Sequence, residues 1–140
     1  MPYKKEDLAY IAGVIDSDGC ISINRDIKKY QPTVQVTQAQ PEAINLINKI
    51  FGGNYRIVKQ SKSSLNYKDL YLWRIRSRKN LGIFLEAILP FLRIKRKQAK
   101  IVIDYCNIRR DSIENNGGNR KNTYSGIEKI MCEKIQKLNH

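Results

Sequence analysis

The sequence has few of the residues that build disulfide frameworks or zinc sites. Its 140 residues include 3 cysteines and 1 histidine, and that histidine is His140, the last residue. Cys20, Cys106 and Cys132 lie far apart and form no C-x-x-C pair, which excludes a Cys/His zinc site. We expect buried thiols and a reducing, intracellular compartment, the cytoplasm of a prokaryote or an organelle. A catalytic metal would need oxygen ligands, which favour Mg²⁺.

Long apolar runs are absent as well. No stretch approaches the ~20 apolar residues of a membrane span, and residues 1–7 carry no apolar signal-peptide core. We therefore expect no membrane partner and no secretion. Hydrophobic residues make up 41% of the chain, which is enough for a core. At this length we predict one domain over residues 1–140, with a core of about 5–110 and a C-terminal helix of about 125–138.

Acidic residues are scarce too. The chain has 13 Asp and Glu against 26 Lys and Arg, a net charge of +13. This excess indicates a polyanionic partner, with nucleic acid favoured over an anionic membrane surface. Residues 54–100 alone carry 13 positive and 2 negative side chains, a local net charge of +11. Charge by itself does not distinguish a repressor from a nuclease.

Two hydrophobic periodicities alternate along the chain. Helical spacing predicts helices at about 5–17, 41–51, 78–89, 95–109 and 125–138. Alternation of apolar and polar residues predicts strands at about 20–25, 33–38, 55–62 and 67–76. The polar segments 26–32 and 111–122 are predicted as links. Strands that arrive as two hairpins make an antiparallel sheet with helices on one face, so we predict an α+β fold of the order αββαββα.

The predicted sheet leaves its other face uncovered. The side chains expected there are polar or basic, namely Ser22, Asn24, Gln35, Arg74 and Arg76. Arg, Asn and Gln are the side chains that read purine edges, and a two-stranded ribbon fits the major groove of DNA. The pattern of residues 55–62 does not decide which of them point to the uncovered face. Arg56 and Lys59 are three residues apart, so they cannot both face the bases of a duplex from a regular strand, and one of them is left for phosphate.

Two aspartates end the first predicted helix, where residues 11–19 read Ile-Ala-Gly-Val-Ile-Asp-Ser-Asp-Gly. The macrodipole disfavours the carboxylates of Asp16 and Asp18 at a helix C-terminus by ~0.3–1 kcal/mol each. A bound cation would reverse this penalty, and Mg²⁺ takes one or two carboxylates together with phosphate and water. The alternative is an ordinary Asx turn after a helix.

One face of the same helix is nearly free of side-chain bulk. This face carries Ala9, Ala12, Gly13 and Asp16. Glycine in mid-helix costs about 1 kcal/mol relative to alanine, and close approach of another backbone is the expected compensation at Gly13. Two such helices side by side would place two Asp18 carboxylates in one symmetric site. A glycine that serves only packing is the alternative.

Residues 11–19 resemble the nine-residue motif of the LAGLIDADG homing endonucleases. The positions identical to that motif are Ala12, Gly13, Ile15, Asp16, Asp18 and Gly19. Residues 89–99 resemble the family's L-x-P-F-L-x-x-K-x-x-Q-A region, and residues 34–38 resemble the end of its second strand. The resemblance spans about residues 7–102 and implies the same αββαββα fold.

The resemblance implies roles for four positions. Asp18 matches the metal-binding acid, and the carbonyl of Ser17 lies where a backbone metal ligand is expected. Gln38 matches the residue that positions water. Lys95 matches a lysine at the periphery of the active site, where it would steady developing charge. The implied cofactor is Mg²⁺, for which Mn²⁺ or Ca²⁺ can substitute in binding, and no small-molecule cofactor is implied.

Two further acids are expected to have other roles. Asp16 is expected to cap or pack the helix junction in preference to binding metal. Glu42 departs from the family, because some members have a basic residue at this position near the active site. That departure puts the peripheral solvent network in doubt, although it leaves the metal carboxylate in place.

The resemblance finally implies a function. One motif fits in 140 residues, and single-motif members act as homodimers, so we expect a homodimeric, Mg²⁺-dependent endonuclease. It would hydrolyse both strands of a long, near-palindromic DNA target, with contacts from Asn24, Gln35, Arg56, Lys59, Arg74 and Arg76. An RNA-splicing maturase of the same family and a non-catalytic DNA-binding regulator are the alternatives, and Asp18 with Lys95 favours the nuclease. Since the chain has no splicing-domain features, an intron-encoded gene is favoured over an intein.

Overall fold

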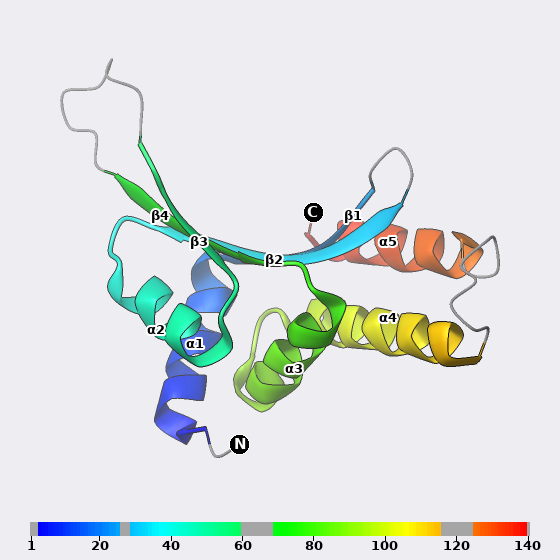
Figure 1. Cartoon of the computed structure of the whole chain (residues 1–140), viewed down its shortest axis with the longest axis horizontal. Helices are drawn as coiled ribbons and strands as arrows, with labels where there is room; N and C mark the ends of the chain where they lie inside the picture. The colour runs from blue at the N-terminus through cyan, green and yellow to red at the C-terminus, as the bar shows by residue number, and fades with distance from the viewer. Residues whose placement is uncertain (1–2, 26–28, 60–68, 116–124, 140) are drawn as a thin grey trace.

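The chain starts with two helix–strand–strand units and continues with helices (Figure 1). The computed structural model describes residues 3–25, 29–59, 69–115 and 125–139, with the backbone alone for 109–115 and 125. The two units contain α1 (Lys5–Asp18), β1 (Gly19–Arg25), β2 (Tyr30–Gln38), α2 (Glu42–Phe51), β3 (Asn54–Val58) and β4 (Leu70–Ile75). They are followed by α3 (Arg78–Ile88), the short 3-10 helix η1 (Leu89–Phe91), α4 (Arg96–Asn115) and α5 (Ser125–Asn139).

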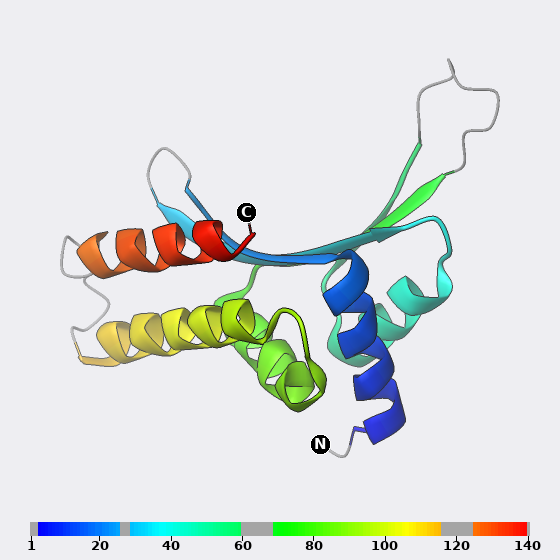
Figure 2. The ribbon, with the colours of Figure 1, turned by 180° about the vertical axis from the view of Figure 1, so that it is seen from behind.

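The strands form one antiparallel sheet in the order β1-β2-β4-β3. In the described part of the chain the helices all lie on one side of this sheet, and none of them covers the other side (Figure 1 and Figure 2). We call the uncovered side the open face. The predicted α+β class, the order αββαββα and the antiparallel sheet are therefore confirmed.

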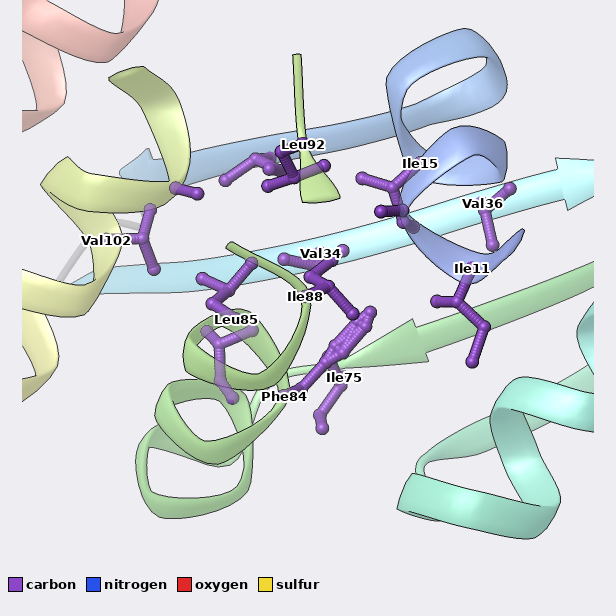
Figure 3. Packing of buried hydrophobic residues seen from close by; sticks show 14 of the residues in the cluster. Ile11, Ile15, Val34, Val36, Ile75, Phe84, Leu85, Ile88, Leu92 and Val102 are labelled. Atoms are coloured by element: carbon purple, nitrogen blue, oxygen red, sulfur yellow. The ribbon is translucent and has the colours of Figure 1, made fainter. Parts of the chain in front are cut away.

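The core lies between the sheet and the helix layer. The strand residues that alternate with the open-face side chains are buried, namely Ile21, Ile23, Val34, Val36, Trp73 and Ile75. Figure 3 shows how Val34 and Ile75 of the sheet meet Ile15 of α1 and Phe84 of α3. Burial of such a side chain contributes about 1.5–3 kcal/mol, so the apolar period fixes which face of each element points inward. None of the described helices is long and apolar enough to cross a membrane.

Helix α5 covers the outer edge of the sheet at β1. Cys132 Sγ donates to the carbonyl of Ile23 at 3.0 Å, and Asn139 Nδ2 donates to the carbonyl of Ile21 at 3.0 Å. Burial raises the pKa of the Cys132 thiol, which keeps its proton for this bond. An unpaired strand edge invites pairing with another chain, so this helix protects the edge that β1 would otherwise expose.

Three sequence-based expectations are wrong in detail. Strand β2 begins at Tyr30, inside the predicted 26–32 link, and it includes Pro32, which strand rules normally exclude. At Pro32 only β1 is paired with β2, because the β2–β4 ladder starts at Val34. Helix α4 continues to Asn115, through the first part of the predicted 111–122 loop. Cys20 is exposed on the open face and is not a buried thiol.

The predicted strands over 55–62 and 67–76 are shorter in the structure. Strand β3 ends at Val58 and β4 begins at Leu70. The residues predicted as strand at 60–62 and 67–68 lie outside the described residues.

Candidate functional site

Helix α1 passes directly into strand β1 at Gly19. A Cβ on Gly19 would lie 2.8 Å from Cα of Ile15 and 2.9 Å from its carbonyl oxygen, which is closer than real Cβ atoms come. The φ of Gly19 is −85°, so the requirement for glycine is steric and not conformational. This tight junction places Asp18, the last residue of α1, beside the end of the sheet with its side chain exposed.

The amide of Gln38 binds the carboxylate of Asp18. Gln38 is the last residue of β2, and its Nε2 donates to Asp18 Oδ2 at 2.9 Å. The structure therefore brings together two of the predicted catalytic side chains, which lie 20 residues apart in the sequence. A carboxylate that accepts one oriented amide proton is fixed in direction, while its other oxygen sites stay available to a ligand.

Asp16 and Lys95 join the end of α1 to the start of α4. The carboxylate of Asp16 accepts hydrogen bonds from the backbone N–H groups of Arg93 at 2.8 Å, Ile94 at 3.2 Å and Lys95 at 3.0 Å. In return, Lys95 Nζ donates to the carbonyls of Ile15 at 3.0 Å and Asp16 at 2.9 Å. We call this arrangement the Asp16–Lys95 clasp.

The clasp matches each charge to a helix end. Free N–H groups at a helix start attract an anion, and free carbonyls at a helix end attract a cation. Asp16 therefore caps the helix junction, as expected. Lys95 lies beside the last turn of α1, so the three predicted catalytic side chains gather around one end of that helix.

Ser17 and Glu42 flank this end of α1. The Ser17 hydroxyl donates to the carbonyls of Gly13 at 3.0 Å and Val14 at 3.3 Å, so the side chain turns back onto its own helix. The role of the Ser17 carbonyl as a metal ligand stays a prediction. Glu42 is the first residue of α2 and is exposed, so an acid stands on the surface where some members have a basic residue.

The four small-face residues of α1 divide into two pairs. Ala12 is 0% exposed within the chain, and Asp16 is held in the clasp. Asp16 is still partly exposed, and the placement of these two residues in a dimer interface stays a prediction. Ala9 and Gly13 are exposed, and among the residues that the structure describes a Cβ on Gly13 would have no atom within 4 Å.

The open face carries a braced arginine. Gln35 of β2 lies directly opposite Arg74 of β4, and Arg74 Nε donates to Gln35 Oε1 at 3.1 Å. On the neighbouring strand, Ser22 Oγ donates to Asn24 Oδ1 at 3.2 Å. These four of the five predicted side chains therefore occupy the face on which they were placed from the alternation.

The register also resolves the parity of β3. Arg56 lies opposite Leu72, two residues from Arg74, so its side chain is on the open face, whereas Lys59 follows the end of β3. Burial, together with the positive charges of Arg76 and Arg56, lowers the pKa of the Arg74 guanidinium. Like charges crowded on one face repel each other, and a bound polyanion would relieve that repulsion.

Three residues of the open face were not identified from the sequence. Gln31 and Thr33 of β2 lie opposite Asn24 and Ser22, and Asn54 of β3 lies opposite Arg74. Thr33 follows from the same alternation that places Gln35. Gln31 was hidden because residues 30–32 read as a link.

The comparisons with known proteins agree on a family. Residues 5–89 match the LAGLIDADG-like domain, and no curated protein matches the sequence. The structure is similar to the homing endonuclease I-CvuI in complex with the I-CreI target, with a TM-score of 0.73 and 22% identity over 96% of this chain and 85% of that one.

Two further solved structures have the same fold. The archaeal intron-encoded homing endonuclease I-Vdi141I, complexed with DNA, gives a TM-score of 0.60 and 17% identity over 98% of this chain and 99% of that one. The group I intron-encoded homing endonuclease I-CeuI, also complexed with DNA, gives 0.57 and 16% over 82% of this chain and 60% of that one. The family match covers more than half of the sequence and includes the α1 motif and the whole sheet. This chain belongs to the LAGLIDADG homing endonuclease family.

Proposed function

We propose that the chain is a site-specific double-strand DNA endonuclease that acts as a homodimer with Mg²⁺ and is encoded by an intron. One observation carries the proposal. In a member of this family, the exposed carboxylate of Asp18 is oriented by Gln38 beside a positively charged open face. The similar structures I-CvuI and I-Vdi141I are homing endonucleases in complex with DNA, which supports the same class of substrate.

Duplex DNA suits the open face better than other polyanions. Its side chains combine positive charge with amides and hydroxyls, whereas a surface that binds only phosphate would need only the positive charge. The braced fork of Arg74 matches the two acceptors of a guanine edge in the major groove. We propose that one chain reads one half-site in this way, with the motif helix of each chain at the centre of the target.

The residues at the end of α1 fit a magnesium ion. No group of three His, Cys, Asp or Glu side chains gathers anywhere in the described ranges, so a cation held entirely by one chain is not supported. Mg²⁺ needs fewer protein ligands, because it keeps water and takes oxygens from a substrate phosphate. Asp18 with the carbonyl of Ser17 would hold it from each chain. When bound, the ion would stabilise negative charge on the phosphate and acidify water.

The neighbouring residues would prepare this site for a phosphate. Gln38 fixes the direction of the Asp18 carboxylate by its amide hydrogen bond. Lys95 uses two of its three N–H donors on the carbonyls of Ile15 and Asp16. The third donor is then available to a phosphate oxygen, and the ammonium is held at a fixed position by the other two. Such preorganised charge stabilises a transition state without rearrangement.

The homodimer is supported by Gly13. Nothing in the described part of the chain approaches the place where its Cβ would be, so packing within one chain does not account for this glycine. Ala9, Gly13 and Ser17 are exposed at four-residue spacing on α1, which leaves a surface without bulk for a second helix. One Asp18 from each chain would provide the two acids that cutting two strands requires.

The test begins with the selection of a DNA target. The full-length protein is used with Ca²⁺ to select bound duplexes from a randomised library, and the selected duplexes are then incubated with Mg²⁺ or with EDTA. We expect cleavage of both strands with Mg²⁺ only. Asp18→Asn should lower the cleavage rate by at least about 10²–10³-fold and leave DNA binding intact or tighter.

Asp104→Asn is the matched control. Asp104 is an exposed acid on α4, so the same loss of one charge should leave cleavage unchanged. Selection of DNA without any cleavage by the unmodified protein would contradict the nuclease and favour a binding protein. Cleavage that survives Asp18→Asn would contradict the assignment of the metal ligand.

A further inference from the structure

A polar pocket lies on the open face toward the hairpin end of β1 and β2. It has a volume of about 250 Å³ and is lined by Asn24, Arg25, Gln31, Thr33 and Arg76. From this pocket we infer that each chain reads one guanine of its half-site at a defined distance from the Gln35–Arg74 pair. The inference rests on the proposed function and specifies how its target is recognised.

Thr33 gives the pocket an unused hydrogen-bonding group. Its side chain is only 2% exposed, and Oγ1 has no hydrogen-bond partner in the described part of the chain. Buried hydroxyls are nearly always paired, because an unpaired one loses its bonds to water without replacement. Thr33 lines the pocket, so a group that enters the pocket can supply the missing partner.

The other side chains of the pocket offer donors in excess of acceptors. The carbonyl oxygen of Asn24 already accepts from Ser22, which leaves its amide N–H groups to donate. The amide of Gln31 donates to the carbonyl of Arg76 at 3.3 Å and is fixed by that bond. Arg76 adds a guanidinium on the same face, and none of the described residues that line the pocket carries a carboxylate.

This set of groups favours guanine. Guanine presents two acceptors in the major groove, O6 and N7, and Arg is its usual partner. Cytosine presents an amino group there and is read by carboxylates, and none of the described residues that line the pocket has one. Adenine is read by an amide that offers a donor and an acceptor together, and Asn24 does not offer both because its carbonyl oxygen already accepts from Ser22.

The register of the sheet gives the distance between the two reading points. Thr33 lies opposite Ser22, and Gln35 lies opposite Cys20, so the two points are two residues apart along β1. Two strand residues span about 6.6 Å, and successive base pairs of a duplex are about 3.4 Å apart. The guanine should therefore lie about two base pairs farther from the centre of the target than the base read by Arg74.

The experiment compares DNA sequences selected by full-length variants from a randomised duplex library. Arg74→Ala identifies the base pair read by that arginine, and Thr33→Val tests the pocket. The valine keeps the shape of threonine and removes only the hydroxyl. We expect it to fold with undiminished thermal stability, to lose the preference for guanine about two base pairs outward, and to bind the guanine-containing target about three- to tenfold more weakly, which is the effect of one lost hydrogen bond.

Two matched variants sharpen the test. Thr33→Ser keeps the hydroxyl and should keep the guanine preference, even if packing suffers. Thr37→Val makes the same change on the same strand and face, nearer to Gln38, and should leave the preference at the pocket position unchanged.

The alternatives give different results. Equal weakening on all sequences with a reduced salt dependence would assign the pocket to a backbone phosphate and overturn base reading. An unchanged preference in Thr33→Val would overturn the role of the hydroxyl while the proposed function stands. Failure of the unmodified protein to select any DNA sequence would overturn the proposed function and this inference together.

Discussion

The two glycines of the α1 motif belong to one helix but have opposite surroundings. A Cβ on Gly19 would collide with the backbone of Ile15, whereas a Cβ on Gly13 would meet no atom of the described residues within 4 Å. The fold of the single chain therefore requires Gly19. It does not require Gly13, although a mid-helix glycine costs about 1 kcal/mol relative to alanine.

The contrast extends to the neighbours of each glycine. Around Gly19, the last turn of α1 is bound by the Asp16–Lys95 clasp and by Gln38. Around Gly13, the side chain of Ala9 is exposed, and Tyr10 on the same turn is 50% exposed. Contacts within the chain thus explain the end of the motif, whereas no contact in the described part of the chain explains the glycine in its middle.

The largest effect should come from a methyl group at the required glycine. Gly19→Ala places a Cβ against the backbone of Ile15, so we expect a loss of up to about 3 kcal/mol in the free energy of unfolding. The displaced junction should also separate Asp18 from Gln38 and abolish cleavage. Urea unfolding of the full-length chain measures the first effect. Gly82→Ala is the control, because its Cβ would make an ordinary contact 3.8 Å from Cys106 Cβ. Equal stability of the two variants would contradict the steric requirement.

The next largest effect should come from opening the clasp on its acidic side. Asp16→Ala removes the acceptor of three backbone N–H groups at the start of α4, which should cost about 2 kcal/mol of stability. Asp16→Asn keeps an oxygen acceptor and should lose less. Thermal and urea unfolding of both variants give the comparison. If asparagine and alanine destabilise equally, the hydrogen bonds to the carboxylate are not what holds the junction.

The sequence predicted the layered fold because short-range patterns control it. Residues such as Ile21 and Ile23 alternate with Ser22 and Asn24, and a period of two residues assigns each side chain to a face. The motif itself is contiguous, so the sequence alone locates the end of α1 with its two acids. The pattern did not predict that β2 begins before Pro32. Proline is tolerated there because the pairing of β2 with β4 starts only at Val34, and the local sequence does not show where that pairing starts.

The clasp and the pocket could not be predicted from the sequence in the same way. Asp16 and the backbone of Lys95 are 79 residues apart, and their contact depends on how α1 and α4 pack. The spacing of Asp18 and Gln38 in the sequence did not predict a contact between them either. Only the resemblance to the family indicated that they lie close together. The unpaired hydroxyl of Thr33 depends on the packing around it, which no alternation of residue types reports.

A smaller effect is expected on the basic side of the clasp. Lys95→Met keeps the apolar stem and removes the ammonium from the carbonyls of Ile15 and Asp16, which should cost about 1 kcal/mol of stability. Lys97→Met, at an exposed position of α4, should cost less than half of that. The cleavage rate of Lys95→Met should also fall, and by more than the smaller fraction of folded protein explains. This rate is measured at saturating DNA under conditions in which the variant is folded. A variant as active as Lys97→Met would confine Lys95 to a structural role.

The smallest change in stability should have the opposite sign and occurs at the other glycine. Gly13→Ala adds a methyl group to open space, so the separated chain should gain up to about 1 kcal/mol from helix propensity. The same methyl group would lie in the proposed contact between two motif helices, where it should weaken self-association. Unfolding at low protein concentration measures the first effect, and sedimentation over a range of concentrations measures the second, because dimer stability depends on concentration. A gain in stability with weaker association would show that Gly13 serves a second chain. A gain with unchanged association would remove the glycine from the interface and leave the middle of α1 without a partner.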